Sequence, residues 1–291
     1  MITVEEYVAL APHTYFKIGG PARFFTRVAN GAEITEALGW AHDHGLRFFV
    51  LGSGSNLLVA DKGFDGLVIK IDLQNISISE ERVTAGAGVA MARLASETIK
   101  HKLAGFEWAV GVPGGVGGSV RGNAGCYGSE IKDVIEKVMA LEVGQGGVVI
   151  TKTFTNAECL FGYRNSVFKQ HTEWIIVSAV LALGAGDSAE SQELVRQFSK
   201  QRAQTQDIGS QCAGCIFKNP EGRSAGQLID SLALKGLRIG NAAVSEKHGN
   251  FILNLGGATA EEVVMLVSIV KERVRQKYGI MLEEEIQYVG F

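Results

Sequence analysis

A run of small residues between positions 105 and 128 constrains this chain more than any other feature of its sequence. It contains Gly111-Val112-Pro113-Gly114-Gly115-Val116-Gly117-Gly118-Ser119, followed by Asn123-Ala124-Gly125. Glycine has no Cβ, so this backbone can approach another surface closely. The bulky Phe106 and Trp108 precede the run, which is unlike a flexible linker. We therefore predict an extended loop that packs against a long diphosphate ligand.

Composition narrows the class of protein. The chain has 291 residues, which is long enough for two or three domains. Hydrophobic residues make up 46% and charged residues 20%, as in an ordinary globular protein. The net charge is -3, so no basic field attracts nucleic acid and an anionic ligand must be held by local groups. We expect no nucleic-acid partner.

The N-terminal stretch and the apolar runs indicate where in the cell the protein is expected. Glu5 and Glu6 interrupt the first apolar stretch, unlike a secretory signal. The longest apolar run, Trp174 to Leu183, has about half the length of a bilayer-spanning helix. We expect a cytoplasmic protein without a membrane partner, as a monomer or a small homo-oligomer.

The pattern of elements predicts a mixed α and β chain. A helix at 33–44 leads into a strand at 47–51, and short strands are expected at 67–71, 138–143, 147–154 and 175–183. The polar stretch 184–193 looks like a domain boundary. Helices are then expected at 194–204 and 224–235. A further helix is expected after the capping box Thr259-Ala260-Glu261-Glu262, with Val263, Val267, Val270 and Val274 on one face. A short strand at 285–289 ends the chain.

A second small-residue loop, Gly52-Ser53-Gly54-Ser55-Asn56, follows the strand at 47–51. Consecutive backbone amides and serine hydroxyls form a concavity that suits an anion. The loop is neither a P-loop nor a complete dinucleotide fingerprint, because Leu57 stands where a third glycine belongs. A tight strand-to-turn connection explains it equally well at this point.

The four cysteines are Cys126, Cys159, Cys212 and Cys215. Free thiols are the expectation for an intracellular chain of this size. Cys212 and Cys215 form a C-x-x-C pair, but a zinc site needs a second matching pair. We therefore expect no metal, and leave a reversible disulfide between these two residues as a hypothesis.

Seven separated motifs, in order, resemble the UDP-N-acetylenolpyruvoylglucosamine reductases, in their shorter type II branch. The motifs are Thr14–Ala22, Gly52–Leu58, Gly111–Tyr127, Gly162–Ser166, Gly214–Pro220, Ala225–Asp230 and Leu282–Ile286. The resemblance implies an α+β fold with a vanillyl-alcohol-oxidase-type FAD-binding domain in two parts, 1–72 and 73–186. A smaller α+β substrate-binding domain at 187–291 follows.

The family resemblance also implies the cofactors and the reaction. FAD is bound without a covalent link and NADPH is the electron donor. The substrate, UDP-N-acetylglucosamine enolpyruvate, takes hydride from flavin N5 at C3 and a proton at C2, giving the UDP-N-acetylmuramate used for peptidoglycan precursors. The implied FAD-binding residues are Gly52, Ser53, Gly54, Ser55, Asn56, Leu57, Pro113, Gly114, Gly117, Gly118, Ser119, Asn123, Ala124 and Gly125.

Three residues match the family's catalytic positions. Hydride addition builds negative charge on the substrate carboxylate, and the planar fork of Arg164 suits a carboxylate. Glu285 is the second polarising group by resemblance. Cys215 stands where most relatives carry the proton-donating serine, and a thiol, with a pKa of about 8.5, gives up a proton more readily than a hydroxyl.

Substrate contacts are predicted less directly. Tyr163, Lys218 and Asn219 lie within the matched motifs, and Arg202 and Gln206 lie in a stretch that faces the UDP portion in relatives. His248 receives no role. Two alternatives remain: an FAD oxidase or dehydrogenase of the same fold acting on another small substrate, and a nucleotide-binding module without activity.

Overall fold

The computed structural model describes residues 1–144 and 148–291, and the chain folds into two compact units. The first unit comprises Met1–Glu5, Phe25–Ser53 and Gly66–Arg202, and the second comprises Glu6–Phe24, Gly54–Asp65 and Ala203–Phe291. Three strands, β1 (Glu5–Ala9), β2 (Pro21–Val28) and β5 (Phe64–Ile71), and helix α5 (Ser188–Thr205) each contain residues of both units. The units are defined by packing, so the division into three ligand-defined domains stays a prediction.

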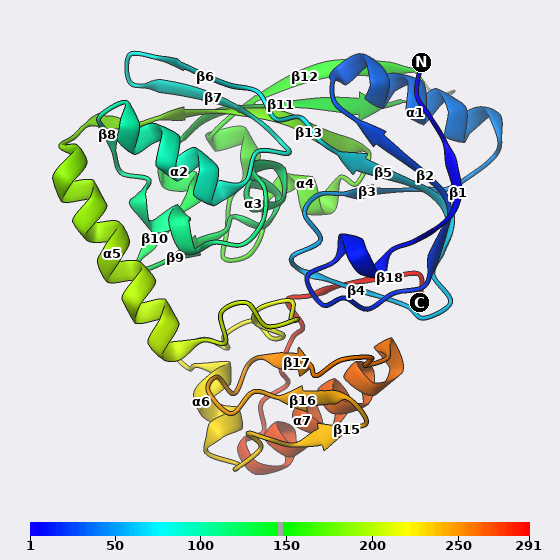
Figure 1. The fold of residues 1–291 in the computed structure, drawn as a ribbon, viewed down its shortest axis with the longest axis vertical. Coiled ribbons are helices and arrows are strands. Elements are labelled where there is room, and N and C mark those ends of the chain that lie inside the picture. The colour runs from blue at the N-terminus through cyan, green and yellow to red at the C-terminus, as the bar shows by residue number, and fades with distance from the viewer. Residues whose placement is uncertain (145–147) are drawn as a thin grey trace. The chain divides into compact units, whose positions relative to one another are not determined.

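The first unit is built around a five-stranded antiparallel sheet in the order β12-β11-β13-β7-β6 (Figure 1). The central strand is buried from Ile175 to Leu181, as the apolar run predicts. Gly147, where a strand was expected to begin, lies outside the described residues. The five strands are β6 (Ile76–Ser79), β7 (Arg82–Gly86), β11 (Ile135–Val143), β12 (Val149–Thr155) and β13 (Trp174–Ala182).

An α/β segment precedes this sheet. Helix α1 (Gly31–Asp43) begins where the Asn30 side chain accepts a hydrogen bond from Glu33 N–H. Strand β3 (Phe48–Leu51) follows and pairs in parallel with β5, which confirms the helix-to-strand prediction. Further elements of the N-terminal region are β1 (Glu5–Ala9), η1 (Ala11–His13) and β4 (Leu57–Val59).

The small-residue run is not wholly extended, so the prediction of an extended loop was wrong, while its packing against a diphosphate ligand stays a prediction. It contains the 3₁₀ helix η2 (Glu107–Gly111) and the helix α3 (Val116–Gly122). Val116 and Val120 are both fully buried, and their spacing of four residues places them on one face of a helix. The neighbouring elements are α2 (Met91–Lys100), β8 (Leu103–Ala104), β9 (Gly125–Cys126), β10 (Ser129–Glu130), η3 (Ile131–Asp133), η5 (Ala157–Cys159), α4 (Val167–Gln170) and β14 (Gly184–Ala185).

The helix predicted at 194–204 begins earlier than expected, inside the polar stretch at 184–193. Helix α5 (Ser188–Thr205) begins within it, because the Asp187 carboxylate accepts hydrogen bonds from the amides of Ala189 and Glu190 at the first turn. Only Ser191 of this helix is buried. A stripe of buried apolar residues therefore could not indicate where the helix begins. No helix in the described part of the chain is both long and apolar enough to cross a membrane.

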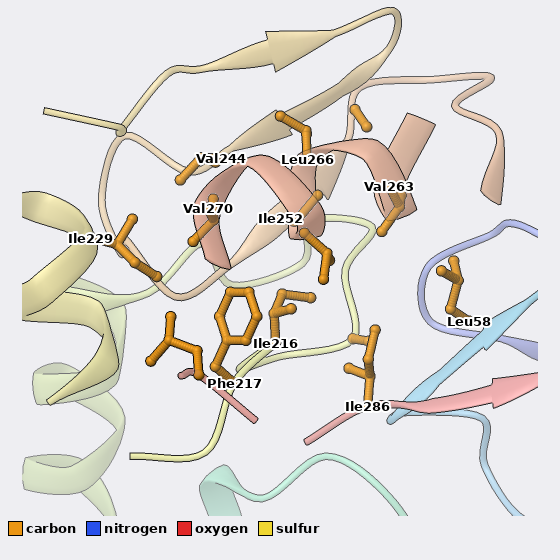
Figure 2. Packing of buried hydrophobic residues seen from close by; sticks show 14 of the residues in the cluster. Leu58, Ile216, Phe217, Ile229, Val244, Ile252, Val263, Leu266, Val270 and Ile286 are labelled. Atoms are coloured by element: carbon orange, nitrogen blue, oxygen red, sulfur yellow. The ribbon is translucent and has the colours of Figure 1, made fainter. Parts of the chain in front are cut away.

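The second unit has its own hydrophobic core around helix α7 (Ala260–Tyr278), shown in Figure 2. The capping box between Thr259 and Glu262 is present, and the predicted stripe of Val263, Val267, Val270 and Val274 is buried. Facing α7 are α6 (Ala225–Asp230) and a three-stranded sheet of β15 (Arg238–Ile239), β16 (Ala242–Val244) and β17 (Ile252–Asn254). Helix α6 ends earlier than the predicted 224–235.

Segments from the N-terminal region complete this second core. Phe16, Ile18 and Leu58 are buried in the same cluster as Ile216 and Ile286. The C-terminal strand β18 (Gln287–Val289) pairs in parallel with β4, which confirms the predicted terminal strand. The loop that leads to Asn56 therefore belongs with the segment carrying Glu285, although the two are far apart in sequence.

Candidate active site

Arg164 lies at the tip of a tight turn in the first unit. The backbone groups of Gly162 and Asn165 exchange two hydrogen bonds, of 3.0 and 3.1 Å. The Arg164 backbone has a φ of 53°, a region that non-glycine residues occupy only when their surroundings impose it. Its guanidinium lies 5.3 Å from the centroid of the Tyr163 ring, and Nη2 donates to the Gly125 carbonyl at 3.4 Å. The turn thus fixes the start of the arginine side chain.

The side chain of Asn123 anchors this turn by a hydrogen bond to its backbone. It is fully buried and ends α3 with a φ of 43°. Its Nδ2 donates to the Gly162 carbonyl at 2.9 Å and to Glu130 Oε2 at 3.1 Å, while its Oδ1 accepts from Lys132 N–H at 3.2 Å. A residue predicted to contact FAD therefore uses its side-chain amide to anchor the segment that carries Arg164.

Two cations gather near Cys126 in the same unit. Burial raises the pKa of the Cys126 thiol to about 11, and the positive charges of Arg202 and Arg164 oppose that rise in part. The thiol is therefore protonated at neutral pH and donates to the Trp108 carbonyl at 3.3 Å. The Arg202 guanidinium also packs on Gly111, 3.0 Å from the position a Cβ would take there. The first unit thus provides a cationic cluster beside the glycine-rich run.

Tyr127 ties that run to helix α5. Its ring stacks on Phe198 with centroids 4.4 Å apart, and its hydroxyl donates to the Phe198 carbonyl at 2.9 Å. Phe198 lies one helical turn before Arg202 in α5. The sequence did not single out Tyr127 for this contact, although it ends the matched motif.

Cys215 and Glu285 lie on neighbouring extended segments of the second unit. Glu285 N–H donates to the Ile216 carbonyl at 2.7 Å, and Lys218 N–H donates to the Glu283 carbonyl at 2.8 Å. On its other side, the segment pairs Cys215 with Phe251. The structure therefore brings together two of the three predicted catalytic residues within one unit.

Two asparagines hold these segments. Asn56 Nδ2 donates to the Glu285 carbonyl at 3.0 Å, and the Asn56 carbonyl accepts from Gln287 N–H at 3.0 Å. Asn250 is 2% exposed. Its Oδ1 accepts from Phe217 N–H at 2.9 Å, its Nδ2 donates to the Phe217 carbonyl at 2.8 Å, and its backbone carbonyl accepts from Ile216 N–H at 2.9 Å. Asn250 was not a sequence-predicted site residue.

The predicted substrate residues of the second unit have partners within the protein. Lys218 forms a 3.0 Å ion pair with Glu283, and the charge and hydrogen bond of Lys218 lower the pKa of that carboxyl. Asn219 Oδ1 accepts from Ala225 N–H at 3.0 Å, at the start of α6. Gln206 is half-buried just after α5. Their roles in substrate binding stay predictions.

The predicted FAD-binding glycines divide into two groups. A Cβ at Gly52 or Gly118 would meet no protein atom within 4 Å, so the backbone there is open to a ligand. Packing explains the others, since a Cβ at Gly54 would lie 2.2 Å from the His13 carbonyl oxygen and one at Gly117 2.9 Å from the Ala87 Cβ. Gly125 is crowded by the Ser129 carbonyl. Gly114 is instead explained by its backbone conformation, with a φ of 120°.

The remaining predicted FAD-binding residues vary in exposure. Leu57 and Ser119 are buried, so a ligand could reach mainly their backbone, whereas Ser53, Ser55, Pro113 and Ala124 are at least partly exposed. A cation that the sequence analysis did not single out, Lys70, lies beside Gly52. The Lys70 ammonium donates to the Gly52 carbonyl, and burial lowers the pKa of that group. Open backbone beside a lysine fits a pyrophosphate.

The other titratable candidates have structural explanations. All four cysteines are free thiols, and burial raises the pKa of Cys159 to about 12. His248 Nδ1 accepts from Asn250 N–H at 3.3 Å, and burial lowers its pKa. Within residues 1–144 and 148–291, no group of three or more His, Cys, Asp or Glu side chains could hold a metal ion.

Comparison with known proteins matches two different family models to this chain. Residues 22–152 match the family model of an FAD binding domain. Residues 204–289 match that of the C-terminal domain of UDP-N-acetylenolpyruvoylglucosamine reductase.

Proteins named UDP-N-acetylenolpyruvoylglucosamine reductase are similar over nearly the whole chain. The one from Caldanaerobacter subterraneus subsp. tengcongensis is 39% identical, covering 96% of this chain and 91% of that protein. The one from Carboxydothermus hydrogenoformans is 40% identical, covering 99% and 94%. The crystal structure of the Thermus caldophilus reductase superposes with a TM-score of 0.83 at 34% identity, covering 99% of this chain and 100% of that one.

Proposed function

The chain belongs to the UDP-N-acetylenolpyruvoylglucosamine reductases, and on that basis we propose how its own residues carry out the reaction. It is an FAD-containing oxidoreductase that uses NADPH to reduce UDP-N-acetylglucosamine enolpyruvate, and the product enters peptidoglycan synthesis. The FAD-binding domain of the vanillyl-alcohol-oxidase type and the smaller α+β domain implied by the sequence agree with this membership. Because NADPH and sugar nucleotides are supplied inside the cell, we place the reaction in the cytoplasm.

FAD, when bound, accepts electrons from NADPH and passes them to the substrate double bond as hydride. The backbone at Gly52 and Gly118 offers space for it, and Lys70 supplies positive charge beside Gly52. An anion beside open amides and a partly buried cation is stabilised far more than in water. These groups would therefore hold the pyrophosphate of the cofactor.

Arg164 stabilises the charge that develops on the substrate. Addition of hydride at C3 pushes electrons toward the carboxylate attached to C2, so negative charge on that carboxylate grows in the transition state. A guanidinium matches a carboxylate with two parallel hydrogen bonds. A cation that is already held in place costs no reorganisation at the moment of reaction. The turn from Gly162 to Asn165 supplies that preorganisation.

Cys215 donates the proton that completes the reduction at C2, and Glu285 acts beside it on the substrate carboxylate. A thiol with an ordinary pKa of about 8.5 is protonated at neutral pH, yet it is acidic enough to give its proton to a carbanion-like centre. The single observation that carries this assignment is the pairing of the two segments, with Glu285 N–H 2.7 Å from the Ile216 carbonyl. Through this pairing, one backbone hydrogen bond fixes the positions of the segments that carry Cys215 and Glu285.

The test is an anaerobic stopped-flow measurement of the two half-reactions. The purified protein should carry yellow flavin, NADPH should bleach it, and the enolpyruvyl sugar nucleotide should restore the colour. A flavin that is reduced by NADPH but not reoxidised by this substrate would contradict the assignment. It would favour an oxidase or dehydrogenase with another substrate.

A further inference from the structure

Three asparagine side chains each donate a hydrogen bond to a backbone carbonyl in or next to a segment that carries a candidate catalytic residue. Asn123 Nδ2 donates to the Gly162 carbonyl at 2.9 Å, Asn56 Nδ2 to the Glu285 carbonyl at 3.0 Å, and Asn250 Nδ2 to the Phe217 carbonyl at 2.8 Å. Gly162 begins the turn that carries Arg164, and Phe217 lies two residues after Cys215. Each catalytic group thus has one amide that holds its own segment.

We propose that Asn123, Asn56 and Asn250 are positioning residues for Arg164, Glu285 and Cys215. The proposal rests on the catalytic roles assigned above. It reassigns the side chains of Asn56 and Asn123, which the sequence placed in FAD binding. Positioning acts through the backbone, so none of the three has to touch the substrate.

The chemistry of the partners supports this reading for each side chain. At Asn250 both ends of the amide are used on one peptide, with Oδ1 accepting from Phe217 N–H and Nδ2 donating to the Phe217 carbonyl. At Asn123 the amide bridges Gly162 and Glu130 while its oxygen accepts from Lys132 N–H. Two of the three side chains are almost completely buried, with exposures of 0% at Asn123 and 2% at Asn250. Buried amides with all partners in place hold a segment in one geometry.

The segments that carry Arg164 and Glu285 need these asparagine hydrogen bonds because regular secondary structure does not hold them. Arg164 occupies a positive φ of 53°, which the turn alone does not favour. Glu285 lies outside the named strands, since β18 begins only at Gln287 and the isolated bridge next to it pairs Glu284 with Phe217. Without the Asn56 amide, Glu285 would keep the bond to Ile216 but lose the one at its carbonyl. A small displacement of a catalytic group slows the chemical step far more than it weakens binding.

The experiment compares Asn123→Asp, Asn56→Asp and Asn250→Asp in the FAD-loaded enzyme. Aspartate keeps the shape and the acceptor oxygen but removes the Nδ2–H donor. We expect reoxidation by the enolpyruvyl sugar nucleotide to slow about tenfold or more. We expect flavin content and reduction by NADPH to stay within about twofold. Amide hydrogen exchange on the flavin-free protein should be faster in the segment that each asparagine holds.

Two other asparagines serve as matched controls. Asn254 in the second unit is 7% exposed and its Nδ2 donates to the Phe16 carbonyl at 2.9 Å. Asn156 in the first unit donates to the carbonyls of Lys132 and Ile135. Asn254→Asp and Asn156→Asp remove the same kind of bond away from the catalytic segments. Both should leave reoxidation within about twofold, even where thermal unfolding shows lower stability.

The outcomes separate this proposal from the proposed function. If Arg164→Ala, Cys215→Ala and Glu285→Ala block reoxidation while the asparagine variants match their controls, the positioning proposal is overturned and the function stands. Loss of flavin in Asn56→Asp or Asn123→Asp would overturn it for that residue in favour of direct cofactor binding. Where an aspartate variant does not fold, the uncharged serine variant at the same position is measured in its place, under the same criteria.

Discussion

The backbone amide of Glu285 donates a 2.7 Å hydrogen bond to the carbonyl of Ile216, the residue that follows Cys215. The proposed proton donor, Cys215, and the proposed polarising residue, Glu285, are therefore carried by paired segments of one unit. Any change that moves one segment moves the other. This relationship makes the chemistry of Cys215 testable by small substitutions that leave the pairing intact, because the bond uses only backbone atoms.

Cys215→Ala should block reoxidation of the flavin by the enolpyruvyl sugar nucleotide, with a loss of about 10² or more, and should leave reduction by NADPH near normal. Cys215→Ser restores an O–H donor of similar size and should retain activity. Stopped-flow absorbance at the flavin band measures both steps. Equal loss of both half-reactions in Cys215→Ala would show that the thiol is not the proton donor.

Arg164→Ala removes the cation that we propose for the substrate carboxylate and should slow reoxidation by about 10² or more. Arg164→Lys keeps the charge but loses the planar fork, so partial activity is expected. Reduction by NADPH should be unchanged in both, because the task of Arg164 begins only when the substrate arrives. Loss of bound flavin, read from the absorbance per protein, would place Arg164 in cofactor binding instead.

Tyr127→Phe removes the hydroxyl that donates to the Phe198 carbonyl at 2.9 Å and keeps the stacked ring. A lost hydrogen bond of this kind costs about 1 kcal/mol of stability. If the bond also fixes Arg202 in α5, KM for the sugar nucleotide should rise several-fold while kcat changes little. An unchanged KM would limit Tyr127 to a structural role.

Leu266→Ala should lower the free energy of unfolding by about 2 to 5 kcal/mol, because Leu266 is fully buried in the core of the second unit. Met265 precedes it in α7 and is 44% exposed, so Met265→Ala is the matched control and should change stability little. Urea unfolding followed by circular dichroism measures both. Similar losses in the two variants would mean that the packing of α7 is not as described.

The ion pair of Lys218 with Glu283 predicts a pH effect with a defined sign. Lys218 lowers the pKa of Glu283, so any stabilisation is present above the unfolded-state pKa and is lost as pH falls through the lowered folded-state pKa. In Lys218→Ala the pKa of Glu283 should rise toward its ordinary value, as followed by NMR titration of the carboxyl carbon. An unchanged pKa would show that the pair does not form in solution.

Local patterns in the sequence determined several elements outright. The capping box at Thr259 and the valine stripe from Val263 predicted α7, and the apolar run after Trp174 predicted the central strand β13. These succeeded because caps and hydrophobic periodicity act over one or two turns. The mistakes were equally local. Val116 and Val120 form one face of a helix, but the glycines between them hid that face, and the Asp187 cap started α5 inside a stretch that looked like a boundary.

The family also followed from the sequence, because the motifs around Arg164, Cys215 and Glu285 keep their order along the chain. The catalytic roles of these three residues stay predictions. Only the tertiary structure decided what holds them. The amides of Asn56 and Asn250 reach backbone carbonyls that are remote in sequence, and Gly54 has no room for a Cβ because it lies close to the His13 carbonyl. Such roles depend on which distant segments fold against each other. Hydrogen bonds from a side chain to a distant backbone carbonyl produce no periodic pattern in the sequence.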